Sequence, residues 1–497
     1  MTAHNRVFLA ALSLSLLLAI APTQAQKVAS SEDPVANIEP ITDSDFYENG
    51  QFSEAKVELG RLLFFDKLLS GNKNIACATC HHPKHGTSDG LPLGFGEGGV
   101  GLGPERRIPA DAPVLARVPR NAPSLYLIGA KEFDKLFLDG RVEKDHHGNW
   151  ESGFWTPARE QFPPGLDNIL AVQAMFPVTS PVEMAGHKGE NPIANRVSND
   201  ILAGPDGAWA LLGKRLQEVP GYVERFKAAF PHIKKASDIS YVDAANAIAA
   251  FQAAAFRSDD SPFDRYLRTR DRSHLDDAAW RGMKLFYGRA GCSDCHSGKF
   301  QTDQDFHAIA MPQIGPGRGA GWDYTYFQAT GFNDRIEDLG RYSTTYQLAD
   351  KYSFRTPSLR NVEITGPWGH AGTFDTLESA VRHHINPIAS LESFDANQVP
   401  LPPLEHIVER TAVRSKLNFR PVNPRRLADW LKRESWVQKT PSLRGAIAAA
   451  NEFGGVELSD EEVADLIAFL RALTDPRSRD QSDLIPDRVP SGLPVPD

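Results

Sequence analysis

Two short stretches of the chain place cysteine and histidine at a spacing that suits covalent attachment of a cofactor. They read Cys77-Ala78-Thr79-Cys80-His81 and Cys292-Ser293-Asp294-Cys295-His296. In such a C-x-x-C-H pattern the two thiols add to the vinyl groups of one haem, and the histidine coordinates the iron. The pattern therefore predicts two covalently bound haem c groups, with His81 and His296 as the proximal iron ligands.

A structural zinc site made of the two C-x-x-C halves is the alternative interpretation. The halves of such sites usually lie closer together in sequence, and zinc gives no reason for a histidine after each half. All four cysteines of the chain fall inside the two motifs, so none is left for a disulfide. This cysteine usage fits thioether bonds to haem and argues against a disulfide scaffold.

Length, net charge and the N-terminal segment indicate the number of domains, the class of partner and the cellular location. A length of 497 residues allows two or more domains, and a net charge of -9 argues against nucleic acid as a partner. Arg6, an apolar run from Val7 to Ala21 and the small-residue site Thr23-Gln24-Ala25 predict a cleaved signal peptide over residues 1–25. The run is short for a membrane span, and an uncleaved anchor is the alternative. We expect a periplasmic protein with no stable membrane insertion after signal cleavage.

Apolar periodicity predicts a mainly α fold, because little of the chain alternates as a strand does. Helices are expected over residues 54–69, 243–256, 375–385 and 460–473. Ser459-x-x-Glu462 forms a capping box at the start of the last helix. Long loops are expected over residues 86–113 and 142–167, and an insertion, irregular in part, over residues 388–455.

A short repeat suggests two related domains. Gly60-x-x-Leu63-Phe64 precedes the first C-x-x-C-H motif, and Gly282-x-x-Leu285-Phe286 precedes the second. The alternative is a pair of unrelated amphipathic helices, each before a ligand loop. With a boundary near Lys235, the prediction is two cytochrome c-like haem domains with long loops and insertions, over residues 26–235 and 236–497.

The ordered motifs around these features resemble those of the bacterial di-haem cytochrome c peroxidases and their MauG-type relatives. The matching segments are Leu59-Gly60-Arg61-x-Leu63-Phe64-Phe65-Asp66, Asp89-Gly90, Arg120-Asn121-Ala122-Pro123, Asp139-Gly140-Arg141, Pro181-Val182-Glu183-Met184, Ser261-Pro262-Phe263-Asp264-Arg265-Tyr266, Arg355-Thr356-Pro357-Ser358-Leu359-Arg360-Asn361 and Thr376-Leu377-Glu378. The resemblance implies an oxidoreductase that reduces hydrogen peroxide. The haem on His81 would be peroxidatic, with an open distal side, and the haem on His296 would be six-coordinate and would relay electrons.

The resemblance also implies the residues that carry the chemistry. The distal acid–base group of the family matches Glu183, and the glutamine that assists it matches Gln173. Burial beside haem would raise the pKa of this carboxyl, which suits proton transfer near neutral pH. A calcium ion usually lies between the domains, and its ligands match the Asn121 side chain and the backbone oxygens of Thr365 and Pro367. Without the resemblance, these positions would be ordinary loop and turn residues.

The first departure from the family pattern lies in the loop after the first motif. Many of these peroxidases carry a histidine there that blocks the peroxidatic iron until the other haem is reduced. An ungapped comparison places Glu97 at that position. We therefore expect an iron that is open in the fully oxidised protein, as in the MauG type. His82 and His85 are the other candidates for a blocking ligand.

The second departure is the distal ligand of the C-terminal haem. The position that holds methionine in the peroxidases and tyrosine in the MauG type is His384 here. Helical phase places His384 on one face with Leu377 and Val381, which favours an inward-facing ligand. We expect bis-histidine ligation by His296 and His384, and a lower potential than methionine gives. The alternatives are His383, if the phase is shifted, and a His384 that is merely packed in the core.

The third departure is Leu138, where the family usually has a tryptophan that passes electrons between the haems. Leucine cannot be oxidised, so either the haems exchange electrons directly or another aromatic residue, such as Trp368 beside His370, takes the role. The segment 142–167 follows in sequence and is expected to be a lid or docking edge of the peroxidatic pocket. The alternative is a solvated surface loop.

The function expected from these residues is a periplasmic di-haem peroxidase of the MauG-like branch. Electrons would come from a small redox protein, a cytochrome c or a cupredoxin. The alternative is MauG-type oxidation of aromatic residues in a partner protein. A non-catalytic di-haem electron-transfer cytochrome is a third possibility, but it would need a sixth ligand at the first haem and gives Glu183 no purpose.

Overall fold

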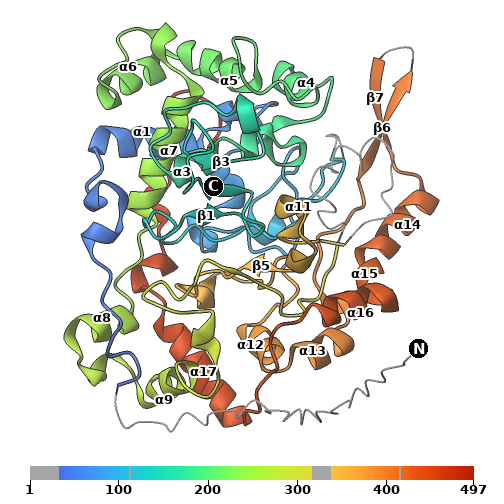
Figure 1. The fold of residues 1–497 in the computed structure, drawn as a ribbon. Helices are drawn as coiled ribbons and strands as arrows, with labels where there is room; N and C mark the ends of the chain where they lie inside the picture. Colours follow the sequence, from blue (N-terminus) through green and yellow to red (C-terminus); the bar gives the residue numbers. More distant parts are fainter. Residues whose placement is uncertain (1–32, 111–113, 316–336, 414–415, 497) are drawn as a thin grey trace, which may run out of the picture. The chain divides into compact units, whose positions relative to one another are not determined.

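Two pairs of crossing helices form the main cores of the fold. Helix α1 (Glu54–Phe65) crosses α7 (Tyr241–Ala255), and α9 (Asp277–Phe286) crosses α17 (Asp460–Ala472). Figure 1 shows α1 beside α7 and α9 beside α17. A Cβ atom on Gly60 would lie 1.9 Å from the carbonyl oxygen of Ala247, and one on Gly282 would lie 1.9 Å from that of Asp465. The two glycines of the sequence repeat thus occupy equivalent places, where two backbones touch.

The computed structural model describes residues 33–110, 114–315, 337–413 and 416–496. The signal peptide predicted over residues 1–25 lies outside this part. Contacts along the chain group residues 33–497 into one unit. Within the described ranges, no helix combines the length and the apolar character that crossing a bilayer requires.

Substitution of either crossing glycine is predicted to destabilise the protein. Gly60→Ala or Gly282→Ala would push a methyl group against a backbone carbonyl, at a cost of about 1–3 kcal/mol or more. Gly445→Ala in α16 (Pro441–Ala449) is the matched control, since no atom lies within 4 Å of its Cβ position. There the higher helix propensity of alanine is expected to stabilise by up to about 1 kcal/mol. Thermal unfolding tests this, and equal Tm shifts for Gly60→Ala and Gly445→Ala would contradict the close crossing.

Helix α7 belongs to the first core, although it follows the boundary predicted near Lys235. Its buried apolar residues, from Tyr241 to Ala255, pack with those of α1 in one apolar cluster. The packing favours a boundary between Phe256 and α8 (Pro262–Thr269), which belongs to the second cluster. The division into two haem domains itself stays a prediction. The two ends of the described chain lie in opposite cores, Val35 in the second and Val489 in the first.

The remaining helices confirm the mainly α fold. The first core also contains α3 (Ile169–Ala174), α4 (Pro192–Val197), α5 (Ala208–Gln217) and α6 (Pro220–Ala229). Other helices are α2 (Cys77–Cys80), α11 (Tyr342–Thr345) and α12 (Leu377–Ile385). Ser459 and Glu462 form the predicted capping box of α17.

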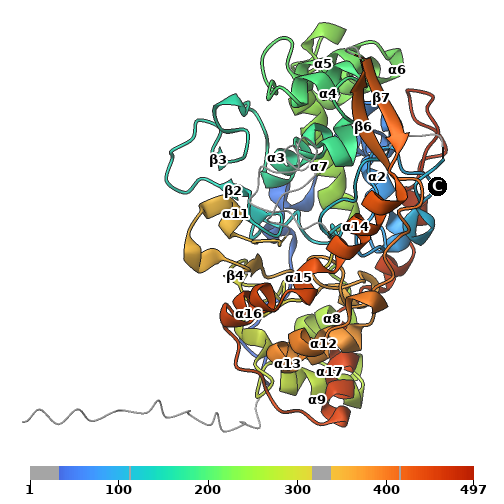
Figure 2. The same cartoon turned by 90° about the vertical axis from the view of Figure 1, so that its right-hand side faces the viewer.

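Short strands occur in three places. β1 (Lys135–Leu136), β2 (Val142–Lys144) and β3 (Phe154–Trp155) form one antiparallel sheet, while β4 (Phe306–His307) pairs with β5 (Phe354–Arg355) and β6 (Val408–Val413) with β7 (Lys416–Pro421). The segment 142–167, expected to be a loop, therefore begins as a hairpin that projects from its surroundings in Figure 2. Strands of two or three residues carry no detectable period, which is why the sequence shows only a loop.

The insertion over residues 388–455 is more regular than its sequence predicts. Besides the β6–β7 hairpin it contains most of α13 (Pro387–Ser393), then α14 (Pro424–Glu434), α15 (Trp436–Lys439) and α16. Apolar residues of the insertion pack against the loop that follows the first motif; the cluster is Phe95, Ile108, Val114, Leu404, Ile407 and Val422. The insertion therefore covers part of this loop.

Candidate active site

The first C-x-x-C-H motif presents a histidine with one nitrogen prepared for a metal. His81 Nδ1 lies 3.1 Å from the carbonyl oxygen of Thr87, so Nδ1 carries the proton and Nε2 is left as the ligand atom. Burial lowers the pKa of His81, which keeps the ring in the neutral form that binds iron. The Thr87 hydroxyl accepts a hydrogen bond of 2.8 Å from the Leu125 N–H, and the Ser88 hydroxyl donates one of 2.7 Å to the Ala122 carbonyl.

The second motif repeats this arrangement. His296 Nδ1 lies 3.2 Å from the carbonyl oxygen of Gln301, which again leaves Nε2 for the iron, and burial lowers the pKa of His296 to about 4. Arg360 Nε donates a hydrogen bond of 2.9 Å to the Lys299 carbonyl and so holds the loop that orients the imidazole. Each motif thus offers two thiols and one neutral imidazole, the donor set that haem c needs.

Arg360 is held in turn by a buried carboxylate, and this pair gives a testable prediction. Arg360 Nη1 lies 2.8 Å from Asp264 Oδ1, and both side chains are 1% exposed. Arg360→Met is expected to cost about 3–5 kcal/mol, because it leaves the Asp264 charge buried and unpaired. It should also lower haem incorporation at the second motif, since the loop before Gln301 loses its anchor. Denaturant unfolding and haem counting per chain measure both effects.

Arg265→Met is the control for this experiment. Arg265 follows Asp264 directly in sequence but pairs with the exposed carboxylate of Asp260, at 2.8 Å. Exposed pairs contribute about 0–1 kcal/mol, so haem content and stability should stay close to those of the unmodified protein. Full stability and two haems per chain in Arg360→Met would contradict the role assigned to the buried pair.

Helix α12 brings His384 opposite His296. The two ring centroids lie 6.3 Å apart, with 58° between the ring planes. A ring nitrogen lies roughly 1 Å from the ring centre and a metal–imidazole bond is about 2 Å long, so two trans ligands of one metal place their centroids about 6 Å apart. His384 Nδ1 lies 2.8 Å from the Ala380 carbonyl oxygen, which leaves Nε2 as its ligand atom.

The neighbouring His383 has a different environment. It is fully buried, with Nδ1 3.0 Å from the Ser390 hydroxyl and Nε2 2.9 Å from the Ile309 carbonyl oxygen. Both nitrogens are therefore engaged in hydrogen bonds within the protein. This geometry favours His384 over His383 as the sixth iron ligand.

The two distal residues expected from the sequence lie on consecutive segments. Glu183 lies in a single turn of π-helix, Pro181–Ala185, which the Ser180 side chain caps. Its negative charge raises the pKa of the Cys80 thiol, which indicates that Glu183 lies near the first motif. Gln173 precedes this turn, at the end of α3, and both side chains are half-buried.

The loop after the first motif packs against the Glu183 segment. The Glu97 N–H donates a hydrogen bond of 2.8 Å to the Val182 carbonyl, and a Cβ atom on Gly96 would lie 2.1 Å from the same oxygen. The buried Arg106 donates to the carbonyls of Gly96 and Gly101 at 2.6 and 2.9 Å. Sequence reasoning missed Arg106, whose partners are backbone carbonyls that no side-chain pattern reveals.

The two histidines considered as blocking ligands have other surroundings. His82 is fully buried, its Nδ1 accepts a hydrogen bond of 3.2 Å from the Lys84 N–H, and its ring packs edge-on against Phe65. His85 lines a small pocket beside Gly366 and other residues of the second half of the chain. These environments argue against either histidine as a ligand of the first iron.

Between the motifs, Leu138 is half-buried and its carbonyl accepts a hydrogen bond of 2.9 Å from the Arg355 N–H. Trp368 Nε1 donates a hydrogen bond of 2.9 Å to the Val362 carbonyl, and the indole packs against the second core, whose margin also includes Leu377 of α12. The Trp368 ring is therefore held on the side of the second motif.

Of the three residues expected to bind calcium, Asn121 and Pro367 are in contact. The Asn121 amide faces the carbonyl oxygen of Pro367, and Asn121 Oδ1 is buried without a hydrogen-bond partner in the described structure. The oxygen and nitrogen of a side-chain amide are interchangeable by rotation, so this pair can present two oxygens to one cation. Thr365 lies two residues before Pro367 and is half-buried.

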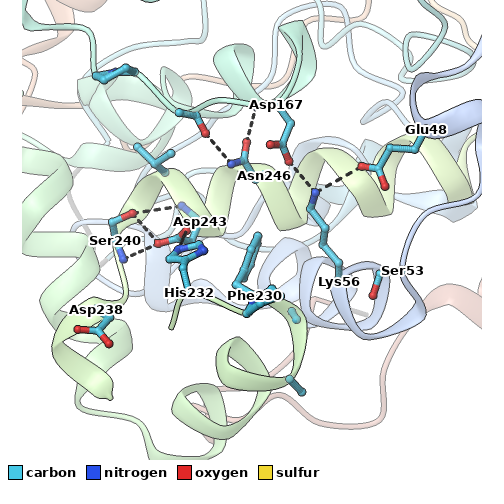
Figure 3. A pocket seen from close by; sticks show the side chains of 16 residues that line it. Glu48, Ser53, Lys56, Asp167, Phe230, His232, Asp238, Ser240, Asp243 and Asn246 are labelled. Atoms are coloured by element: carbon cyan, nitrogen blue, oxygen red, sulfur yellow. Dashed lines mark hydrogen bonds and ion pairs between the residues drawn. The ribbon is translucent and has the colours of Figure 1, made fainter. Parts of the chain in front are cut away.

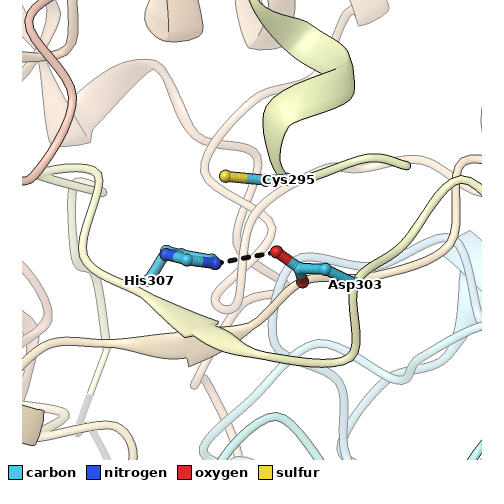
Figure 4. A group of neighbouring side chains, drawn as sticks. All are labelled: Cys295, Asp303 and His307. Carbon is cyan, nitrogen blue, oxygen red and sulfur yellow. Dashed lines mark hydrogen bonds and ion pairs between the residues drawn. The ribbon is translucent and has the colours of Figure 1, made fainter.

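Two further features of the described residues are a cluster of potential metal ligands and an open pocket. In the described residues, one cluster of potential metal ligands contains a cysteine, and it joins Cys295 to Asp303 and His307 (Figure 4). Because no second cysteine joins it, this cluster does not support the zinc alternative. An open pocket beside α1 and α7 contains Lys56 and His232, paired with Asp167 and Asp243, and no residue predicted for the active site (Figure 3).

Comparison with known proteins identifies the family. The family model of the di-haem cytochrome c peroxidases matches residues 54–272. The methylamine utilization protein MauG of Methylorubrum extorquens is 32% identical over 332 residues, which are 66% of this chain and 68% of that protein. The chain belongs to the di-haem cytochrome c peroxidase family. The peroxidase is also 29% identical to the cytochrome c551 peroxidase of Pseudomonas aeruginosa, over 74% of this chain and 82% of that one.

The fold agrees with a solved structure as well. A MauG-like protein associated with microbial copper homeostasis superposes with a TM-score of 0.51 at 23% identity, covering 90% of this chain and 95% of that one. This structural likeness concerns the fold alone. The family match and the similarity to MauG and to the cytochrome c551 peroxidase show an oxidoreductase of the MauG-like branch that acts on peroxide and carries two haem c groups. The resemblance seen in the sequence motifs is confirmed.

Proposed function

We propose that the peroxidase reduces hydrogen peroxide at the haem on His81, with electrons relayed through the haem on His296 and His384. The difference between the two iron sites carries this assignment. An iron held by two imidazoles has no open position for peroxide, and the pair formed by His296 and His384 has the spacing of such ligands. The first motif instead has a carboxylate, Glu183, nearby.

The haem on His81 would supply the iron that binds peroxide and the electrons that break its O–O bond. Glu183 would take the proton of the peroxide oxygen near the iron and give it to the oxygen that leaves as water. Gln173 would hold the peroxide by a hydrogen bond. The buried side chains of Val182 and Met184 flank Glu183 and would limit access of bulk water.

The predicted signal peptide would export the protein to the periplasm. The electron donor there would be a small cytochrome c or a cupredoxin. With Leu138 at the usual tryptophan position, Trp368 is the candidate for an electron step between the haems. Steady-state assays with hydrogen peroxide and a reduced donor should oxidise two one-electron donors per peroxide. Peroxide consumption that no donor of either class accelerates would contradict this function.

Oxidation of a partner protein's aromatic residues is the second candidate function. Glu97, in place of a blocking histidine, favours it, because an iron that needs no prior reduction can react with peroxide before any donor binds. Mass spectrometry of co-purifying proteins after peroxide treatment, without donor, tests this function. Modified tryptophan or tyrosine in a partner supports it, and unmodified partners together with rapid donor oxidation refute it.

We also propose a calcium ion bound by Asn121, Thr365 and Pro367. The buried Asn121 Oδ1, which has no hydrogen-bond partner among the described residues, supports this site. Chelation, or Asn121→Ala, is expected to lower the thermal midpoint and to slow electron transfer between the haems, because the bond between the two loops is lost. Asn149→Ala, at an exposed position in the β2–β3 connection, is the control. A chelator that changes neither quantity would contradict a bound calcium.

A further inference from the structure

A second carboxyl group lies beneath the surface beside the Glu183 segment. Glu97 is 4% exposed, and its Oε1 accepts hydrogen bonds of 2.7 Å from the side-chain amides of both Asn72 and Asn74. Its Oε2 is buried and has no hydrogen-bond partner among the described residues. Leaving a buried polar atom unsatisfied costs folding free energy, so this arrangement calls for a reason beyond stability.

The outer side of Glu97 is close to solvent. Asn72 and Asn74 are both exposed, so the carboxyl lies one layer of side chains below the surface. Asn72 Nδ2 also donates a hydrogen bond of 2.8 Å to the carboxylate of Glu190, which accepts another of 2.8 Å from the His187 N–H. The two exposed amides thus connect Glu97 to the solvent side, and the half-buried Glu190 places a second carboxylate beside Asn72.

The inner side of Glu97 meets the distal segment. The hydrogen bond from the Glu97 N–H to the Val182 carbonyl aligns the two backbones. A Cβ atom on Gly96 would lie 2.9 Å from Glu183 Cα, so only glycine at this position allows the segments to come so close. Two carboxyl-bearing segments, one near solvent and one near the first motif, therefore run side by side.

The charges around Glu97 suit a group that both takes up and releases protons. Burial raises the pKa of Glu97 to about 7, and the nearby Glu190 charge raises it as well. Hydrogen bonds from Asn72 and Asn74 and the positive charge of Arg106 act in the opposite direction. An acid–base group transfers protons best when its pKa is close to the ambient pH.

We propose that Glu97 feeds protons to the peroxidatic pocket, taking them up on the solvent side at Asn72 and Asn74 and passing them through water to Glu183. The inference rests on the proposed role of Glu183. Reduction of hydrogen peroxide to two waters consumes two electrons from the redox donor and two protons from solvent. The first water forms by transfer of a proton between the two peroxide oxygens, and the second forms only when both electrons and both outside protons arrive.

Glu97 therefore acts through Glu183 and does not touch the peroxide, and it ends each turnover with the proton it began with. This predicts that its loss slows repeated turnover and spares the first reaction with peroxide. Because Glu97 loses its proton as the pH rises through about 7, its contribution falls over the same range.

Glu97→Gln in the fully loaded protein tests the proposal, because glutamine keeps the shape and still accepts the amide hydrogen bonds but cannot ionise. The reaction with one equivalent of peroxide is expected to stay within about twofold, while steady-state turnover slows by about tenfold and loses its decline between about pH 6 and pH 8. The infrared signal of carboxyl ionisation over this pH range, measured without peroxide, should decrease. Glu105→Gln, an exposed carboxylate of the same loop, is the matched control and should change none of these.

An unchanged turnover rate, pH profile and infrared signal in Glu97→Gln would overturn the proposal. Glu183→Gln separates this outcome from failure of the proposed function, because it must slow the first reaction with peroxide. If Glu97→Gln does not take up both haems, Glu97→Asp is the second variant. It should shift the midpoint of the pH profile, and an unshifted midpoint would count against Glu97.

Discussion

Glu183→Gln is expected to slow the reaction of the oxidised protein with one equivalent of peroxide by about 10²- to 10⁴-fold. This range is what a positioned acid–base group contributes, and glutamine cannot move a proton from one peroxide oxygen to the other. Glutamine has nearly the same size. The backbone N–H of residue 183 donates a hydrogen bond of 3.4 Å to the Ser180 hydroxyl, and the substitution keeps this donor. Haem content and stability should therefore stay unchanged. Stopped-flow absorption of the haem measures the rate.

Glu105→Gln serves again as the control, since Glu105 is exposed on the loop that packs against the Glu183 segment. Its reaction with peroxide should match that of the unmodified protein. A Glu183→Gln rate within about twofold of the unmodified one would mean that proton transfer does not depend on this carboxyl.

The second large effect is expected at His384. His384→Ala should remove the sixth ligand of the second iron and convert its low-spin signal to a high-spin one, because no other imidazole faces His296 in the described structure. His383→Ala is the matched control. It should keep the low-spin signal but lose about 1–3 kcal/mol of stability, since it leaves the Ile309 carbonyl and the Ser390 hydroxyl without a partner.

Electron paramagnetic resonance and denaturant unfolding of both variants test this pair of expectations. A low-spin second haem that survives in His384→Ala and disappears in His383→Ala would show that the helical phase was misassigned. If both variants keep the low-spin signal of the second haem, its sixth ligand lies elsewhere in the chain.

The features that could be predicted from the sequence are those that depend on local spacing. The C-x-x-C-H motifs, the helical phase of His384 and the glycine of each repeat all follow from residues within two or three helical turns. The crossing of these helices at Gly60 and Gly282 could not be predicted, because the contacting residues Ala247 and Asp465 lie more than a hundred residues away along the chain. For the same reason the boundary expected near Lys235 separates α7 from the core to which it belongs.

The rest of the candidate site depends on long-range contacts between loops. Glu97 is visible in the sequence only as a departure from a family position. Its burial follows from Asn72 and Asn74, which precede the first motif, and from the segment around Val182. Likewise the insertion over residues 388–455 shows no sign in its own sequence that it packs on Phe95.

The most direct test of the two-site account is a low-temperature electron paramagnetic resonance spectrum of the fully oxidised protein, recorded before and after one equivalent of peroxide. The account predicts one high-spin signal, from the haem on His81, and one low-spin bis-histidine signal, from the haem on His296 and His384. Peroxide should remove the high-spin signal at once, without prior reduction. Two low-spin signals that do not change with peroxide would contradict an open peroxidatic iron.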